Sequence, residues 1–344
     1  MRRTIDDLRQ MQSLPLEAKI KMTKRRIRDW YEYWDGQVYV SFSGGKDSTV
    51  LLHLARQVCP DIEAVFVNTG LEYPEVQKFV KKFDNVTILR PEMRFDEVIK
   101  KYGYPVISKE VSLALWYAKK GSVWANNYLD GLDKNGSPNS FKKAMYSKYK
   151  PILEADFVCS DKCCLAMKEK PLDDYVKKTG RKPITALMAA ESKKRERVWL
   201  RTGCNAFDSK HHMSKPMSFW TEQDVLEYIK ESNIPIASVY GNIVYKENPE
   251  QIRMEEYGFA KCGTEKLCTT GCERTGCIFC AFGSHLEKVS RFERLKETHP
   301  KQYAYCIGGG EYVNGVWQPS KAGLGMGHVF DELNKIYGNG FIKY

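Results

Sequence analysis

Short apolar runs alternate with amphipathic segments through the first hundred residues of the chain. Three of these runs have the length and the β-branched content of buried strands: VYVSF (38–42), EAVFVNTG (63–70) and NVTILRP (85–91). Each run is followed by a helix-like segment, and in STVLLHLARQVC the residues Val50, Leu51 and Leu54 lie on one side. Because strands that alternate with helices are joined by βαβ crossovers, the pattern predicts an α/β fold with a parallel twisted sheet and flanking helices.

The remaining segments differ in character from this alternating pattern. Residues 5–34 carry an irregular apolar stripe among many basic residues and are expected to be helical. Residues 118–150 are polar and are expected to be an insertion or a mobile loop, and the chain beyond 236 is rich in cysteine. The predicted organisation has three parts: an N-terminal helical segment (1–35), an α/β domain (36–236), and a cysteine-rich region with a C-terminal tail (237–344).

Composition and charge bear on membrane association, on location and on the kind of partner. The chain has 344 residues, 42% of them hydrophobic, and a formal net charge of +11. It has no apolar run of about 18 residues, so no membrane association is expected. The charged N-terminus, MRRTIDDLRQMQSL, lacks the apolar core of a secretory signal, so a cytoplasmic location is expected. The positive charge fits either a solvated basic surface or an anionic partner, such as a nucleotide or a nucleic acid.

The motif SGGKDS (43–48) stands between a predicted strand and a predicted helix. Gly44 and Gly45 let the backbone approach a ligand closely, and the helix that follows offers free N–H groups to an anion. Lys46 adds a positive charge, and the two serines add hydroxyl donors. The spacing matches neither a Walker A loop nor the dinucleotide fingerprint. A glycine turn without a ligand is the alternative, but the convergence of donors favours a phosphate site.

These residues carry a resemblance to a known family. SFSGGKDST resembles the PP-loop of the ATP pyrophosphatase (adenine nucleotide alpha-hydrolase) superfamily, whose members cleave ATP between the α- and β-phosphates. Within it the chain resembles the phosphoadenosine phosphosulfate (PAPS) reductase family, through VNTGLEYPEV (67–76), AAESKKR (189–195) and PMSFWTEQDVLEYIKESNIP (216–235). The resemblance covers roughly residues 35–285 and implies a Rossmann-like PP-loop fold.

The resemblance also implies which residues bind the nucleotide and its magnesium ion. It implies a nucleotide site formed by Ser41, Ser43, Gly44, Gly45, Lys46, Asp47, Ser48, Asn68, Thr69, Gly70, Glu191 and Arg195. Lys46 and Asp47 are the expected catalytic residues. Lys46 would stabilise charge on the phosphates, and Asp47 would orient Mg²⁺ or the lysine.

Two features distinguish ATP-cleaving members from sulfonucleotide reductases. The reductases have a modified loop, whereas Gly44 to Ser48 is intact here, as in the ATP-cleaving branch. The reductases also carry a C-terminal segment whose cysteine attacks sulfur, whereas GLGMGHVFDELNKIYGNGFIKY (323–344) contains no cysteine. The resemblance therefore favours ATP as the nucleotide.

Most of the eleven cysteines gather in two clusters, at 159–164 and 262–280. Short spacing in a reducing compartment favours a metal site over disulfides. Adjacent Cys163 and Cys164, followed by Cys277 and Cys280, resemble the ligands of a 4Fe–4S cluster in bacterial adenylylsulfate (APS) reductases. Four thiolates also suit zinc, which is the alternative. Further candidates, either ligands or nearby non-ligand thiols, are Cys159, Cys262, Cys268 and Cys272.

Three functions are consistent with these features. The first is an ATP-dependent transferase that adenylylates an acceptor, releases pyrophosphate and passes sulfur to it, which makes it a sulfurtransferase. RNA or DNA would be the acceptor, and a partner such as a cysteine desulfurase would donate sulfur. The second is an oxidoreductase resembling APS or PAPS reductases. The third is a non-catalytic sensor that binds nucleotide, cluster and nucleic acid. Pyrophosphate release from ATP separates the first function from the third.

Overall fold

The computed structural model describes residues 3–209, 211–246 and 265–344. It contains two compact units whose segments interleave along the chain. The first unit comprises residues 1–68, 72–89 and 173–275, and the second comprises residues 69–71, 90–172 and 276–344. These units do not follow the predicted contiguous divisions at residues 35 and 236, because the chain passes from one unit to the other several times.

The first unit is built on a six-stranded sheet with the order β3-β2-β1-β5-β7-β6. Its strands are β1 (Val38–Ser41), β2 (Ala64–Val67), β3 (Val86–Leu89), β5 (Lys182–Ile184), β6 (Asn205–Ala206) and β7 (Met213–Ser214). All neighbouring pairs are parallel except β6 and β7, and Val40 lies between Ala64 and Ile184. The predicted parallel sheet is confirmed, and the three strands predicted from apolar runs are β1, β2 and β3.

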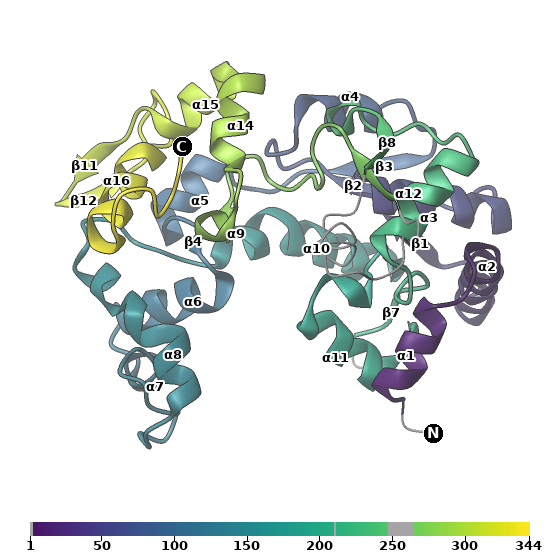
Figure 1. Cartoon of the computed structure of the whole chain (residues 1–344), viewed down its shortest axis with the longest axis horizontal. Helices are drawn as coiled ribbons and strands as arrows, with labels where there is room; N and C mark the ends of the chain where they lie inside the picture. Colours follow the sequence, from purple (N-terminus) through teal and green to yellow (C-terminus); the bar gives the residue numbers. More distant parts are fainter. Residues whose placement is uncertain (1–2, 210, 247–264) are drawn as a thin grey trace, which may run out of the picture. The chain divides into compact units, whose positions relative to one another are not determined.

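Helices cover this sheet and contribute its core (Figure 1). Those of the first unit are α1 (Ile5–Gln12), α2 (Leu16–Tyr33), α3 (Lys46–Val58), α4 (Pro74–Val80), α11 (Lys193–Thr202), α12 (Glu222–Glu231) and most of α10 (Lys170–Thr179). Helix α3 packs against β1, α2 and α12. Val40, Leu51 and Trp30 are fully buried there. A short antiparallel pair, β8 (Ile243–Lys246) and β9 (Lys266–Thr269), packs beside α12.

The second unit is mostly helical. Its helices are α5 (Phe95–Tyr102), α6 (Lys109–Ala118), α7 (Val123–Leu129), α8 (Ser140–Tyr146), α9 (Lys162–Cys164), α14 (Arg291–Thr298), α15 (Pro300–Ile307) and α16 (Met326–Tyr337). Two small sheets complete it, a parallel pair of β4 (Val106–Ile107) with β10 (Ala281–Phe282) and an antiparallel pair of β11 (Glu311–Val313) with β12 (Val316–Gln318). Leu295, Phe330 and Leu333 lie in its core.

Residues 118–150, expected to be an insertion or a mobile loop, contain the two helices α7 and α8. Their polar composition conceals a series of aromatic ring contacts. The Tyr117 and Trp124 rings lie 5.5 Å apart, and the Trp124 and Tyr128 rings lie 5.2 Å apart. Aromatic side chains bury a large apolar area each, so a few of them stabilise short helices that polar composition alone would not predict.

None of the helices in the described part of the chain is both long enough and apolar enough to cross a bilayer.

Candidate functional site

The predicted phosphate loop lies where the strand order of the first unit reverses. From β1 the chain builds outward through β2 and β3 on one side, and β5 adds on the other side of β1. The loop follows the carboxyl end of β1, and the segment with Glu191 follows the carboxyl end of β5. Ligands of open α/β sheets bind at the carboxyl ends of the strands at such a reversal. The fold therefore places two predicted segments at one binding position.

Backbone geometry makes Gly44 necessary in the loop. Its φ is +70°, in the left-handed region, and a Cβ added there would lie 2.6 Å from Val80 Cγ2 and 2.8 Å from Val76 Cγ1. The serines fix the loop from within, since the Ser43 and Ser48 hydroxyls lie 3.0 Å apart and Ser48 Oγ donates to the Gly45 carbonyl at 2.9 Å. Helix α3 then begins at Lys46 with no side-chain cap.

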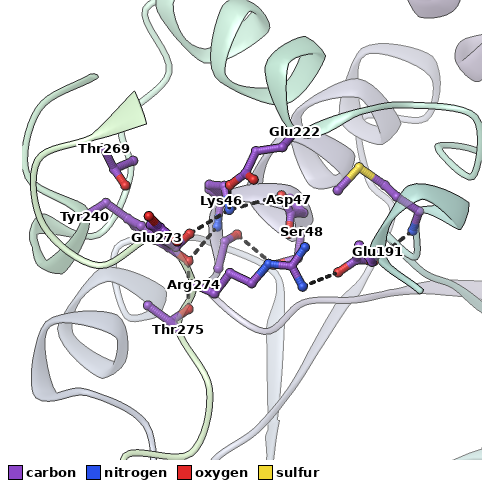
Figure 2. A network of polar contacts seen from close by, with 12 residues as sticks. Lys46, Asp47, Ser48, Glu191, Glu222, Tyr240, Thr269, Glu273, Arg274 and Thr275 are labelled. Atoms are coloured by element: carbon purple, nitrogen blue, oxygen red, sulfur yellow. Dashed lines mark hydrogen bonds and ion pairs between the residues drawn. The ribbon is translucent and has the colours of Figure 1, made fainter. Parts of the chain in front are cut away.

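Lys46 is buried and surrounded by oxygen atoms (Figure 2). Its Nζ lies 3.1 Å from a carboxylate oxygen of Glu222 and donates to the Glu273 carbonyl at 2.9 Å. Its backbone N–H donates to the Tyr240 hydroxyl at 3.1 Å, and that hydroxyl lies 2.7 Å from Thr275 Oγ1. The ammonium group and the first amide of α3 are therefore both bonded to oxygen atoms at the helix N-terminus, a position that favours anions.

Asp47 is a half-buried carboxylate with incomplete hydrogen bonding. Its Oδ1 is buried and accepts no hydrogen bond from the described residues, and Lys46 Nζ lies 3.8 Å from it. Burial raises the pKa of Asp47 above its ordinary value, and the charges of Lys46 and Arg274 only partly oppose this. A buried carboxylate oxygen without a donor is a candidate ligand for a cation.

Glu191 and Arg195, both predicted to bind nucleotide, form an ion pair with each other. Glu191 also accepts from the Met188 backbone N–H at 3.1 Å, and Arg274 lies 3.4 Å from its other oxygen. Figure 2 shows Arg274 directed toward Glu191 and Asp47 lying beside Lys46. Two arginines therefore flank one carboxylate on the β5 side of the loop. An incoming anion would compete with Glu191 for these two arginines.

The other predicted nucleotide-binding residues lie close to strand ends. Ser41 is the last residue of β1. Asn68 follows β2, the neighbouring strand, and its backbone N–H donates to the Leu89 carbonyl at 2.8 Å. Thr69 and Gly70 belong to the second unit. The structure thus brings the loop, Asn68, Glu191 and Arg195 to the same edge of the sheet.

Sequence reasoning missed the residues that face the loop from distant segments: Glu222, Tyr240, Glu273, Arg274 and Thr275. Glu222 is the first residue of α12 and looked like part of a helix cap. Arg274 and its neighbours stand inside the cysteine-rich segment. The charged residues in CERTGC (272–277) were the available signal, because charges rarely interrupt a segment that serves packing alone.

The four cysteines predicted as cluster ligands line one pocket in the second unit. Cys163, Cys164, Cys277 and Cys280 share it with Leu71, Phe95, Pro105, Met167 and Lys168. An apolar pocket with four thiols fits a thiolate-bound iron–sulfur cluster by donor type. No group of three or more His, Cys, Asp or Glu side chains within residues 3–209, 211–246 and 265–344 is arranged to hold a single metal ion.

Electrostatics distinguish the two adjacent cysteines. The Cys163 thiol donates a hydrogen bond to Cys164, which raises the pKa of Cys163 and lowers that of Cys164. Lys109 further lowers the pKa of Cys164, although burial opposes this. Burial raises the pKa of Cys280. The two adjacent thiols therefore differ in acidity, with Cys164 the more acidic.

Of the four further candidate ligands, the three that the structure describes are not among the residues that line this pocket. Cys159 belongs to the second unit, and burial raises its pKa to about 12. Cys268 lies on β9 and Cys272 is buried after it, both in the first unit. Cys262 lies outside the described residues. Cys159 is buried and is not among the residues that line the pocket, so it is better described as part of the core.

Comparisons with known proteins identify the family of the chain. The family model of the phosphoadenosine phosphosulfate reductase domain matches residues 37–111 and 129–282, about two thirds of the chain. Adenosine 5'-phosphosulfate reductase of Staphylococcus epidermidis is 23% identical over 217 residues, which cover 61% of this chain and 68% of that protein.

Two further similarities are a short sequence match and a structural alignment at low sequence identity. An uncharacterised protein of Methanocaldococcus jannaschii is 39% identical over 98 residues, and this match covers 26% of the chain and only 24% of that protein. The crystal structure of PAPS reductase from Candida auris, a phosphate complex, aligns with a TM-score of 0.36 and 13% identity over 76% of this chain and 96% of that one.

Proposed function

Because the chain belongs to the phosphoadenosine phosphosulfate reductase family, we propose that it binds ATP on its phosphate loop and transfers the adenylyl group to an acceptor. The observation that carries the proposal is the unmodified SGGKDS loop, whose lysine is buried at the strand-order reversal of the sheet. A nucleotide with three phosphates presents more negative charge to this position than a sulfonucleotide does.

Different residues of the site contact different phosphates of ATP. Lys46 Nζ exchanges its contacts with Glu222 and the Glu273 carbonyl for phosphate oxygens. The Lys46 backbone N–H exchanges its contact with the Tyr240 hydroxyl for a second phosphate, helped by the positive end of the helix dipole. Arg195 and Arg274 give up their ion pairs with Glu191 and contact the phosphate oxygens that Lys46 and the helix do not reach. These donors stabilise the negative charge that develops on the leaving pyrophosphate.

Asp47 holds the magnesium ion in this proposal. Its Oδ1 is buried without a hydrogen-bond donor among the described groups, which suits a ligand to a hard cation. A bound Mg²⁺ neutralises phosphate charge and screens the half-buried carboxylate. The raised pKa of Asp47 in the absence of a cation reflects the burial that such an ion would compensate.

The reaction then proceeds by two displacements. An acceptor oxygen attacks the α-phosphorus of ATP, the bond to the bridging oxygen breaks, and the electron pair leaves with pyrophosphate. A sulfur nucleophile next attacks the activated carbon or phosphorus of the acceptor, and AMP leaves with its oxygen. A partner such as a cysteine desulfurase supplies the sulfur, and a nucleic acid is the acceptor favoured by the net charge of +11.

The four thiols of the second unit would hold a 4Fe–4S cluster. Cys163, Cys164, Cys277 and Cys280 provide the ligand number and type that such a cluster requires, in an apolar pocket. When bound, the cluster supplies electron transfer or a binding point for sulfur. Lys109 and Lys168 lie near enough to Cys164 to lower its pKa, and they would offset the negative charge of the thiolate set.

The second candidate function is sulfonucleotide reduction. It is favoured by the similarity to the S. epidermidis reductase and by the four thiols in one pocket. The intact phosphate loop favours ATP instead, so the two candidates predict different nucleotides.

Calorimetric titration with ATP and with adenylylsulfate tests the proposal. The parent chain should bind ATP with magnesium more tightly, and Lys46→Ala should weaken ATP binding about tenfold or more, because a hydrogen bond to a charged group contributes about 1.5–3 kcal/mol. Lys78→Ala, which removes an exposed lysine of α4, is the matched control. Equal ATP affinities of the parent and Lys46→Ala would refute the assignment, and sulfite release from adenylylsulfate would establish the reductase.

A further inference from the structure

The segment of residues 116–150, here called the lysine–aromatic segment, concentrates positive charge. It contains seven lysines and two aspartates, so about a tenth of the chain carries a net +5 of the total +11. Among its lysines, Lys120, Lys134, Lys143 and Lys148 are exposed. The segment lies wholly within the second unit and includes α7 and α8.

The two aspartates of this segment are already engaged. Asp130 forms an ion pair with Lys150. Asp133 accepts from the backbone N–H groups of Asn135 and Ser137 at 2.8 and 3.0 Å, which closes a turn. Throughout the described ranges of the chain, no carboxylate forms an ion pair with the other six lysines. Lys119 Nζ instead donates to the Ala155 and Phe157 carbonyls at 3.3 and 3.1 Å. The charges of the exposed Lys120, Lys134, Lys143 and Lys148 are available to an external anion.

A continuous row of aromatic rings runs through the same segment. The rings of Trp116, Tyr117, Trp124, Tyr128 and Tyr146 follow one another at centroid distances of 4.9, 5.5, 5.2 and 5.4 Å. Lysine ammonium groups lie over the first ring of the row and over its last two rings. Lys120 Nζ lies 3.5 Å above the Trp116 ring, and Lys142 Nζ lies 3.6 Å above the Tyr128 ring.

One further aromatic side chain of the segment is exposed to solvent. Phe141, beside Lys142 and Lys143, is 66% exposed, and Val123 at the start of α7 is 72% exposed. An exposed phenylalanine next to two lysines costs solvation free energy unless a partner covers it. Alternating aromatic and basic side chains provide what a nucleic acid strand requires, namely surfaces for base stacking and cations for phosphates.

We propose that the lysine–aromatic segment binds single-stranded nucleic acid. Unpaired bases stack on the exposed Phe141 ring, and the exposed lysines of the segment contact the phosphates. Duplex ends and grooves present few free base faces, so a single strand fits better. The inference does not depend on ATP or on the phosphate loop, because the segment and the loop lie in different units.

Fluorescence anisotropy with the full chain tests this proposal. The probes are labelled 20-residue strands of mixed sequence, as DNA and as RNA, and the DNA duplex of the same sequence. Lys120→Ala/Lys143→Ala/Lys148→Ala should weaken binding of the single strands about tenfold or more. It should also reduce the slope of log affinity against log salt by about 2, since each phosphate contact on a single strand contributes about 0.7. Phe141→Ala should weaken binding about fivefold or more, with little change in the salt slope.

A control with the same loss of charge separates a defined surface from general attraction. Lys78, Lys81 and Lys82 are exposed lysines of the first unit. Lys78→Ala/Lys81→Ala/Lys82→Ala should keep most of the affinity. Equal loss in the two triple variants would overturn the proposal, as would tighter binding of the duplex than of either single strand. Circular dichroism should show that all variants remain folded, and ATP titration should show unchanged nucleotide binding, so failure here is distinguishable from failure of the proposed function.

Discussion

Gly44→Ala is expected to destabilise the first unit by about 2–5 kcal/mol. Alanine at the φ of +70° found at this position costs about 1–2 kcal/mol, because its Cβ approaches the next carbonyl. The new Cβ would also lie 2.6 Å from Val80 Cγ2 and 2.8 Å from Val76 Cγ1, both on α4. Overpacking of that kind typically costs a further 1–3 kcal/mol. The two costs add because the backbone strain and the contact with α4 are separate.

Gly180→Ala is the matched control for the backbone cost. Gly180 has a φ of +73° in the same unit, and an added Cβ would have no neighbour within 4 Å. It should therefore cost only about 1–2 kcal/mol. Urea denaturation followed by tryptophan fluorescence measures both variants, since Trp30 and Trp220 are fully buried in this unit. ATP titration should show weaker binding for Gly44→Ala than for Gly180→Ala.

The comparison of the two variants decides whether the reasoning holds. If Gly44→Ala and Gly180→Ala lower the free energy of unfolding equally, the contact of the loop with α4 does not constrain residue 44. If Gly44→Ala is destabilised as expected but binds ATP like the parent chain, the loop geometry serves folding and not the phosphate site.

Two further variants test the electrostatics and the cysteine pocket. Because burial raises the pKa of Asp47, the folded chain holds this proton more tightly than the unfolded chain, so the ionised carboxylate costs stability that grows as pH rises through the raised pKa. Asp47→Asn should therefore resist urea better than the parent at pH 7 and lose this advantage as pH falls below about 4; an advantage that grows toward acid pH would contradict the argument. Cys280→Ser should abolish iron binding in anaerobically purified protein, as measured by iron content and absorbance. Cys159→Ser alters a thiol outside the pocket and should keep the iron. One zinc and no iron in the parent chain would exclude the cluster.

The sequence by itself determined the features that depend on neighbouring residues. The alternation of apolar runs and amphipathic segments predicts β1, β2, β3 and their helices, because strand and helix periods are local properties. The phosphate loop is equally local, since strand, glycines, lysine and helix are contiguous. Glu191 and Arg195 were identified through a short family motif, and the structure places them after β5 at the reversal of strand order.

Only the tertiary structure decided which distant residues meet. Cys163 and Cys164 share a pocket with Cys277 and Cys280 because the fold joins segments more than a hundred residues apart. Tyr240, Glu222 and Arg274 surround the loop for the same reason, and no period in the sequence marks them. The helices of 118–150 depend on ring contacts that polar composition conceals. Contacts of this kind depend on the path of the whole chain, which local propensities do not specify.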